Sequence, residues 1–197
     1  MHKRIHVLLT PGIDGDCTYL ETNTSCWSDK YGIVPHYYTI NFRRGTNAEE
    51  QRNLYLKKVQ DTKARFLIAV SGSGLLALDA LKRFPVQIQG VILISARLRP
   101  GYFPVIPYVY TLLRYPIFFS YLRSHKKTLR DVDTSRVMTM SSRWDEVVPP
   151  STVKLRGAHN FRITMRPKQW PFHRYFSRYV VTDYEKEITE FIQNTAQ

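Results

Sequence analysis

The 197-residue sequence has few cysteines and no long apolar segment. Its two cysteines, Cys17 and Cys26, are too few for a disulfide framework, and no spacing of cysteine and histidine fits a zinc site. With 9 glycines and 11 prolines, the chain is also unlike disordered or collagen-like polymers. The longest apolar region, 102–122, is interrupted by Arg114 and three prolines, so we expect no membrane-spanning helix. What remains is a chain of ordinary globular composition, long enough to bury its own core.

The N-terminal region lacks the features of a secretion signal. A basic start is followed by only five apolar residues, 5–9, before Pro11. A signal peptide carries a longer apolar core and a small-residue cleavage site. We therefore expect a cytoplasmic protein with reduced cysteines.

Acidic residues are scarce relative to basic ones. The chain has 16 aspartates and glutamates against 29 lysines and arginines, a net charge of +13. Much of the excess lies in 121–180, with 13 basic and 4 acidic residues. Such a surface attracts polyanions or anionic membranes, although a basic composition also occurs without such a partner. No motif that reads nucleic acid is present, so we expect no specific nucleic-acid recognition.

Short apolar runs alternate with amphipathic segments along the chain. The run at 66–70 has no polar alternation, which is typical of a strand buried on both faces of a parallel sheet. Helices are predicted over about 47–61, capped by Asn47, over 75–83, and from a capping box at 182–185. The predicted strands are 5–9, 37–42, 66–70, 91–94, 137–140 and 161–165. This alternation predicts an α/β fold, with a mostly parallel central sheet flanked by helices.

The third predicted strand ends at a tight Ser-Gly-Ser-Gly turn that begins with Ser71. A serine on a strand-to-helix turn is the layout of a nucleophile elbow, which exposes the hydroxyl and needs small residues two positions away on each side. The usual pattern has glycine at both of these positions, and this sequence has Ala69 and Ser73. Taking Ser73 as the nucleophile instead places the bulky Leu75 two residues on, so we favour Ser71. A Gly/Ser turn before a helix can also bind a phosphate group.

Two segments resemble parts of the α/β-hydrolase family. Segment 71–85 resembles the family's nucleophile helix, down to its closing aromatic-proline pair. Segment 9–15, Leu-Thr-Pro-Gly-Ile-Asp-Gly, resembles the family's oxyanion loop, with Pro11 in place of histidine. The resemblance implies that backbone N–H groups of Ile13 and Gly72 bind the oxyanion of the reaction.

A third segment, 143–150, resembles the family's acid loop, Asp-x-Val-Val-Pro. This resemblance makes Asp145 the acid of the triad, with Glu146 at a variable position. Two histidines compete as the base. His159 follows Asp145 by only 14 residues and comes before the last predicted strand. His173 comes after that strand in the sequence and before the last predicted helix. The order of elements in the family therefore favours His173.

The resemblance covers nearly the whole chain and implies an activity. Ser71, Asp145 and His173 occur in the family's order, which implies a serine hydrolase that cleaves a carboxylic ester or thioester of a small acyl substrate through an acyl-enzyme. Such chemistry needs no cofactor and no metal. An amidase or peptidase uses the same triad. Because both elbow glycines are replaced and Asp14 lies beside the oxyanion loop, a non-catalytic relative that binds polyanions or anionic membranes through the basic face is the alternative.

An aromatic and basic stretch, 97–130, separates the fourth and fifth predicted strands and contains no acidic residue. Its position resembles that of the family's cap, so we interpret it as a cap insertion within a single domain over 1–197. Such a cap binds an apolar group of the substrate. The aromatic side chains also fit a helix that packs on the sheet.

Overall fold

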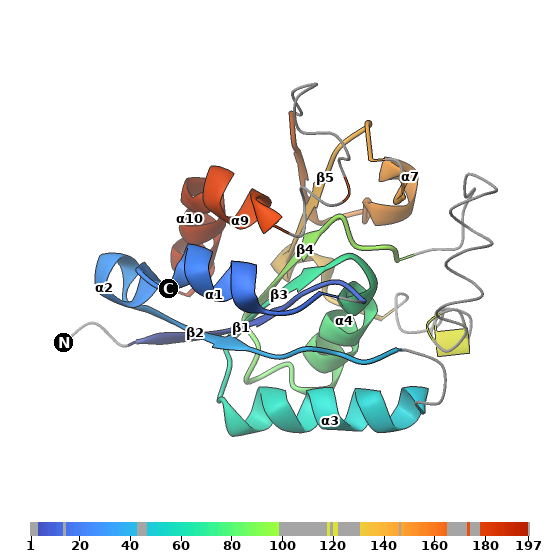
Figure 1. Cartoon of the computed structure of the whole chain (residues 1–197), viewed down its shortest axis with the longest axis horizontal. Coiled ribbons are helices and arrows are strands. Elements are labelled where there is room, and N and C mark those ends of the chain that lie inside the picture. The colour runs from blue at the N-terminus through green and yellow to red at the C-terminus, as the bar shows by residue number, and fades with distance from the viewer. Residues whose placement is uncertain are drawn as a thin grey trace.

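Six parallel strands form one sheet at the centre of the computed structural model (Figure 1). The strands are β1 (Ile5–Thr10), β2 (Ile33–Tyr37), β3 (Phe66–Val70), β4 (Gly90–Ile94), β5 (Val137–Ser141) and β6 (His159–Arg162), in the order β2-β1-β3-β4-β5-β6. The structure describes residues 4–13, 15–42, 47–98, 118, 120, 121, 131–145, 147–164, 173 and 178–196. The prediction of an α/β fold with a mostly parallel sheet is confirmed.

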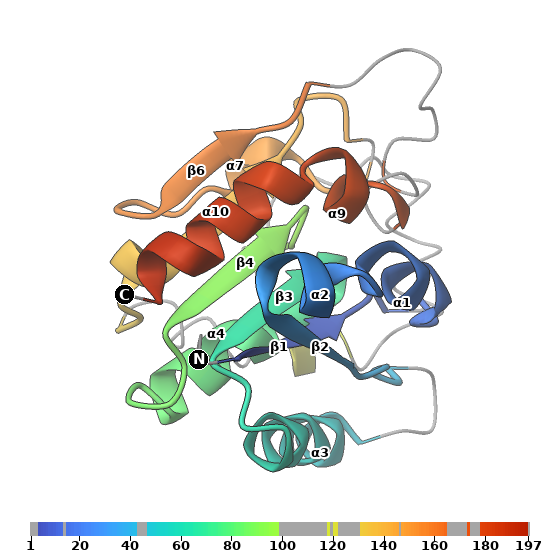
Figure 2. The ribbon, with the colours of Figure 1, turned by 90° about the vertical axis from the view of Figure 1, so that its left-hand side faces the viewer.

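Helices cover both faces of this sheet. Those with bounds in the structure are α1 (Thr18–Thr24), α2 (Trp27–Tyr31), α3 (Ala48–Asp61), α4 (Gly74–Arg83), α7 (Pro150–Val153), α9 (Val180–Asp183) and α10 (Glu185–Thr195), with short 3-10 turns η1 (Ser71–Ser73) and η3 (Thr134–Arg136). Helices α3 and α4 lie on one face, and α1, α2 and α10 on the other (Figure 2). None of the helices in the described part of the chain is long and apolar enough to cross a membrane.

Successive strand residues enter two separate cores, because side chains alternate between the faces of a strand. Leu67 and Ala69 of β3 pack with α3 and α4, whereas Phe66, Ile68 and Val70 pack in the core that includes residues of α1, α2 and α10. Burial on both faces explains the uninterrupted apolar run of this strand. The strand that precedes Ser71 is therefore anchored from both sides.

Three local predictions need correction. The second strand spans 33–37 and not 37–42, because the β1 ladder pairs with Ile33–Tyr37 and the chain then leaves the sheet to bury Ile40 and Phe42 under the helices. The sixth strand spans His159–Arg162 and not 161–165, because its mostly exposed side chains give no apolar pattern that marks its bounds. The capping box at 182–185 is absent, since Thr182 already lies inside α9. Capping of α3 by the Asn47 side chain is confirmed.

Of the stretch 97–130, the structure describes only residues 97, 98, 118, 120 and 121, so the predicted cap lies largely outside the described residues. Phe118 and Tyr121 are buried, and their rings lie about 6 Å from the ring of Phe42, at 5.9 and 6.0 Å between centroids. These two aromatic residues thus pack in the core on the α3 and α4 side.

Candidate active site

The turn after β3 holds Ser71 in an unusual backbone conformation. Its φ angle is +56°, a region that residues with side chains seldom occupy, and the chain then passes through η1 into α4. Space around the turn is tight: a Cβ placed on Gly12 would lie 3.2 Å from the Cβ of Ser71. Backbone strain of this kind clusters at functional sites. The turn therefore has the tight, strained geometry that the sequence predicts.

Ser73, the competing serine, is turned into the protein. Its hydroxyl is buried and donates to the carbonyl oxygens of Val70, at 2.8 Å, and Thr10, at 3.2 Å. These bonds tie the turn to the ends of β3 and β1. A serine thus replaces the expected glycine at this position by satisfying its own hydroxyl locally.

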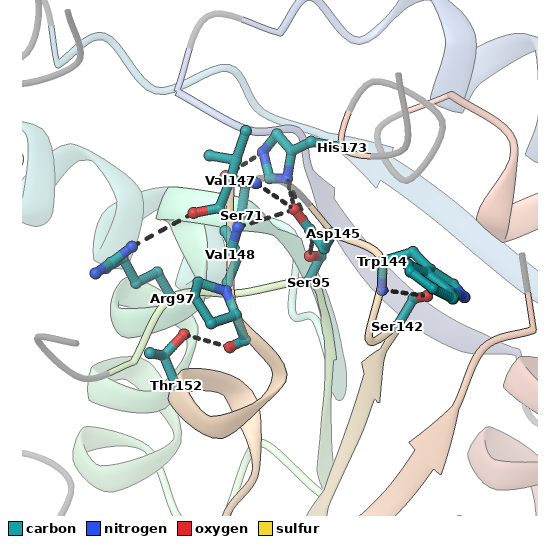
Figure 3. Close-up of polar contacts among 11 residues, drawn as sticks. Ser71, Ser95, Arg97, Ser142, Trp144, Asp145, Val147, Val148, Thr152 and His173 are labelled. Atoms are coloured by element: carbon teal, nitrogen blue, oxygen red, sulfur yellow. Dashed lines mark hydrogen bonds and ion pairs between the residues drawn. The ribbon is translucent and has the colours of Figure 1, made fainter. Parts of the chain in front are cut away.

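His173 lies between Ser71 and Asp145 (Figure 3). Its Nε2 is 3.0 Å from Oγ of Ser71, and its Nδ1 is 3.2 Å from each carboxylate oxygen of Asp145. A carboxylate accepts a hydrogen bond from Nδ1–H, which leaves Nε2 of a neutral ring as the acceptor for the serine hydroxyl. The three residues, from three distant parts of the chain, form one continuous hydrogen-bonded row.

Asp145 follows β5, and its side chain is fully buried. Backbone N–H groups of Val147 and Val148 donate to its Oδ1 at 2.9 and 2.8 Å, and the hydroxyl of Ser95 donates to Oδ2. Burial alone raises the pKa of Asp145, but the neighbouring His173 and the donated hydrogen bonds outweigh it and hold the pKa below its ordinary value. The carboxylate is therefore ionised at neutral pH.

His159, the competing histidine, lies elsewhere. It begins β6 and pairs with Met138 near the start of β5, whereas Asp145 follows the end of that strand. Its ring is exposed and meets Phe191 edge-on at 5.6 Å between centroids. The structure therefore brings His173, and not His159, to Ser71 and Asp145. Glu146 and Asp14 lie outside the described residues.

Ile13 and Gly72 are in close contact beside the serine turn. A Cβ on Gly72 would lie 2.3 Å from Cγ1 of Ile13 and 3.0 Å from Cε2 of Phe118. Only glycine fits at this position, because any side chain would displace Ile13. Ile13 and Gly72, the two residues predicted to bind the oxyanion, are thus in contact with each other, and Gly72 directly follows Ser71.

Ser95, which directly follows β4, was not among the predicted site residues. Nothing in the local sequence marks this serine, since its contact with Asp145 joins positions 50 residues apart. Its place at the carboxyl end of a parallel strand is the one available signal, because active sites of open α/β sheets form at that edge. Within the described ranges no three metal-binding side chains gather at one place.

This arrangement permits a defined step of chemistry. A hydroxyl hydrogen-bonded to an imidazole, whose other nitrogen faces a buried carboxylate, can transfer its proton to the ring as its oxygen attacks a carbonyl carbon. The side chain of His173 is 22% exposed. Ser71 lies on the strained turn at the carboxyl end of β3.

No family model and no curated protein matches the chain. Several solved structures are similar. An alpha/beta hydrolase enzyme from a sediment metagenome of the Mar Chica lagoon has a TM-score of 0.65 and 14% identity, over 98% of this chain and 90% of that one. The monoacylglycerol lipase of Paleococcus ferrophilus gives 0.60 and 14%, over 90% and 94% of the chains. The enol-lactonase of Burkholderia xenovorans gives 0.60 and 12%, over 98% and 92%. On its sheet order, its helical layers and these similarities, the chain has the α/β-hydrolase fold.

Proposed function

We propose that the chain is a serine hydrolase that cleaves a carboxylic ester or thioester of a small-molecule substrate. The observation that carries the proposal is the hydrogen-bonded row from Ser71 through His173 to Asp145. The row lies where the strained turn presents the serine hydroxyl. Similarity in fold to a lipase and a lactonase supports the same class of reaction.

In the proposed reaction, Oγ of Ser71 bonds to the acyl carbon while its proton moves to Nε2 of His173. Asp145 stabilises the charged ring and holds its orientation. The ring then returns the proton to the departing alcohol or thiol, leaving an acyl-enzyme. Water, deprotonated by the same ring, releases the acid and restores the serine.

The developing negative charge on the carbonyl oxygen needs donors close by. We assign this role to the backbone N–H groups of Ile13 and Gly72, whose residues are in contact beside Ser71. Backbone donors at fixed positions stabilise such charge because they need no reorganisation during the reaction. The row and these donors require neither metal nor organic cofactor.

The proposal is tested by labelling the purified protein with a fluorophosphonate probe. We expect labelling of the wild type, none of Ser71→Ala, and a rate on the order of 10³-fold lower for His173→Ala, since a general base contributes about 10²- to 10⁴-fold. Ser73→Ala is the matched serine control and remains labelled. An unlabelled wild type, or labelling that depends on Ser73, contradicts the proposal.

The substrate class is tested with the same variants. A series of p-nitrophenyl esters and acyl thioesters of increasing chain length is offered to the wild type and to Ser71→Ala. We expect turnover by the wild type alone. Turnover of amide substrates with none of esters or thioesters would contradict the assignment to ester chemistry.

A further inference from the structure

Ser95 occupies a position with an unusual combination of properties. It is the first residue after β4, it is fully buried, and its φ angle is +45°. Its backbone N–H donates to the carbonyl oxygen of Met140 in β5 at 2.8 Å. Its main chain is thereby fixed against the strand that leads to Asp145.

The hydroxyl of Ser95 points at Asp145 and donates to Oδ2 (Figure 3). The other oxygen, Oδ1, already accepts the N–H groups of Val147 and Val148. The carboxylate is thus held from both sides by neutral donors, while both of its oxygens lie 3.2 Å from Nδ1 of His173.

The strained backbone conformation of Ser95 indicates that its side chain has a specific structural role. Glycine adopts a positive φ without strain, whereas serine does so at a cost in free energy. The hydroxyl offsets this cost by satisfying a buried carboxylate oxygen, which is expensive to leave without a partner. A glycine at this position would relieve the backbone and leave Oδ2 short of one donor.

We infer that Ser95 is a positioning residue, which fixes the carboxylate of Asp145 in the orientation that holds His173 toward Ser71. The inference rests on the proposed function. Rotation about the last bond of an aspartate side chain is soft, so donors on one oxygen alone leave the plane of the group poorly defined. A donor on each oxygen fixes the plane, and with it the direction of the hydrogen bond to the histidine ring.

The test compares Ser95→Ala and Ser95→Gly, which both lack the hydroxyl but differ in how they tolerate a positive φ. We expect each to lower kcat/KM by at least about tenfold, the lower end for one lost hydrogen bond to a charged group, with the loss in kcat and not in KM. A matched control is Thr139→Val, which removes another buried hydroxyl bond, to Oδ1 of Asn160, away from Asp145. It leaves kcat/KM unchanged.

A second readout does not depend on activity. The proton between Nδ1 of His173 and Asp145 gives a low-field NMR resonance, assigned by its loss in His173→Ala. We expect this resonance to broaden or move in both Ser95 variants and to stay unchanged in Thr139→Val. An unchanged resonance in either Ser95 variant, or loss of kcat in Ser95→Ala alone, overturns the inference, because backbone strain would then be the cause. Absence of the resonance from the wild type overturns it too.

The two readouts separate this inference from the proposed function. If the wild type fails to react with the fluorophosphonate probe, the proposed function falls, while the NMR comparison still decides whether Ser95 orients Asp145. If the wild type reacts and the Ser95 variants behave as the wild type in both readouts, the inference alone falls.

Discussion

Asp145 keeps a negative charge in a fully buried position because every oxygen has donors. A buried carboxylate without partners would instead take up a proton. Here the charge, the orientation and the contact with His173 depend on the same few hydrogen bonds. A residue of this kind links folding stability to pH as well as serving the proposed chemistry.

The linkage gives a prediction for Asp145. Because its pKa is lower in the folded chain than its ordinary value, the folded state binds fewer protons than the unfolded state in acid. The stability from this group is present above about pH 4 and is lost as the pH falls through the folded-state pKa. We expect the free energy of unfolding to fall more steeply with acid in the wild type than in Asp145→Asn. Urea denaturation between pH 7 and pH 3 measures both; parallel slopes would contradict the prediction.

At the level of single residues, part of the candidate site could be predicted from the sequence. Ser71 and Asp145 stand in local patterns that strand-ending turns produce, and His173 follows from the order of elements; the structure brings these three together. Ser95 was out of reach, because its contact depends on the neighbouring positions of β4 and β5 in the sheet. The sequence around a single strand does not indicate which other strand will lie next to it in the sheet.

The two helices on one face of the sheet, α3 and α4, are joined by a buried ion pair. Arg52 donates to Asp79 through Nε at 2.8 Å and through Nη2 at 3.3 Å, and both side chains are less than a tenth exposed. Removing one partner of such a pair leaves a buried charge unbalanced, whereas replacing both with apolar residues is often neutral. The half-exposed Arg83, 3.5 Å from Asp79, compensates only in part.

We therefore expect Arg52→Met to lower the free energy of unfolding by about 3 kcal/mol, and Arg52→Met with Asp79→Leu to recover most of the loss. The surface pair of Lys82 and Asp131, at 2.8 Å, is the control, and Lys82→Met costs less than about 1 kcal/mol. Urea denaturation measures all three variants. Equal losses of unfolding free energy in Arg52→Met and Lys82→Met would contradict the prediction, because burial of the ion pair would then make no difference to stability.

Elements with a strong apolar period were predictable, and those without one were not. β3 and β4 have entirely buried side chains, and their predicted bounds differ from the observed ones by at most one residue. The apolar residues at 38–42 look like a strand in sequence, yet Ile40 and Phe42 are buried against helices beyond the end of the β1 ladder. β6 shows the opposite case, a strand of mostly exposed side chains that pairs with β5 although its sequence has no strong apolar pattern.

The candidate site draws on the whole molecule. Its residues follow β1, β3, β4 and β5 and reach into the C-terminal quarter of the chain, so they meet only when the parallel sheet is complete. The sequence predicts a single folding unit over 1–197. If the chain unfolds as that one unit, its site and its sheet are lost in the same transition.

We therefore expect fluorophosphonate labelling and the far-ultraviolet circular dichroism signal to disappear at the same urea concentration. The labelling rate and the circular dichroism signal are both measured at each urea concentration after equilibration, and their midpoints are compared. Labelling lost well before the helical signal would indicate that the site opens separately from the sheet.

The outer strands of the sheet, β2 and β6, are the edges to which a strand of a second copy of the chain could add. An unpaired edge is a template on which another chain adds a strand. β2 carries Pro35, which has no N–H to donate, and β6 is a short strand with exposed His159 and the exposed positive charge of Arg162. Within the described part of the chain, these features disfavour growth of the sheet from copy to copy at both of its edges.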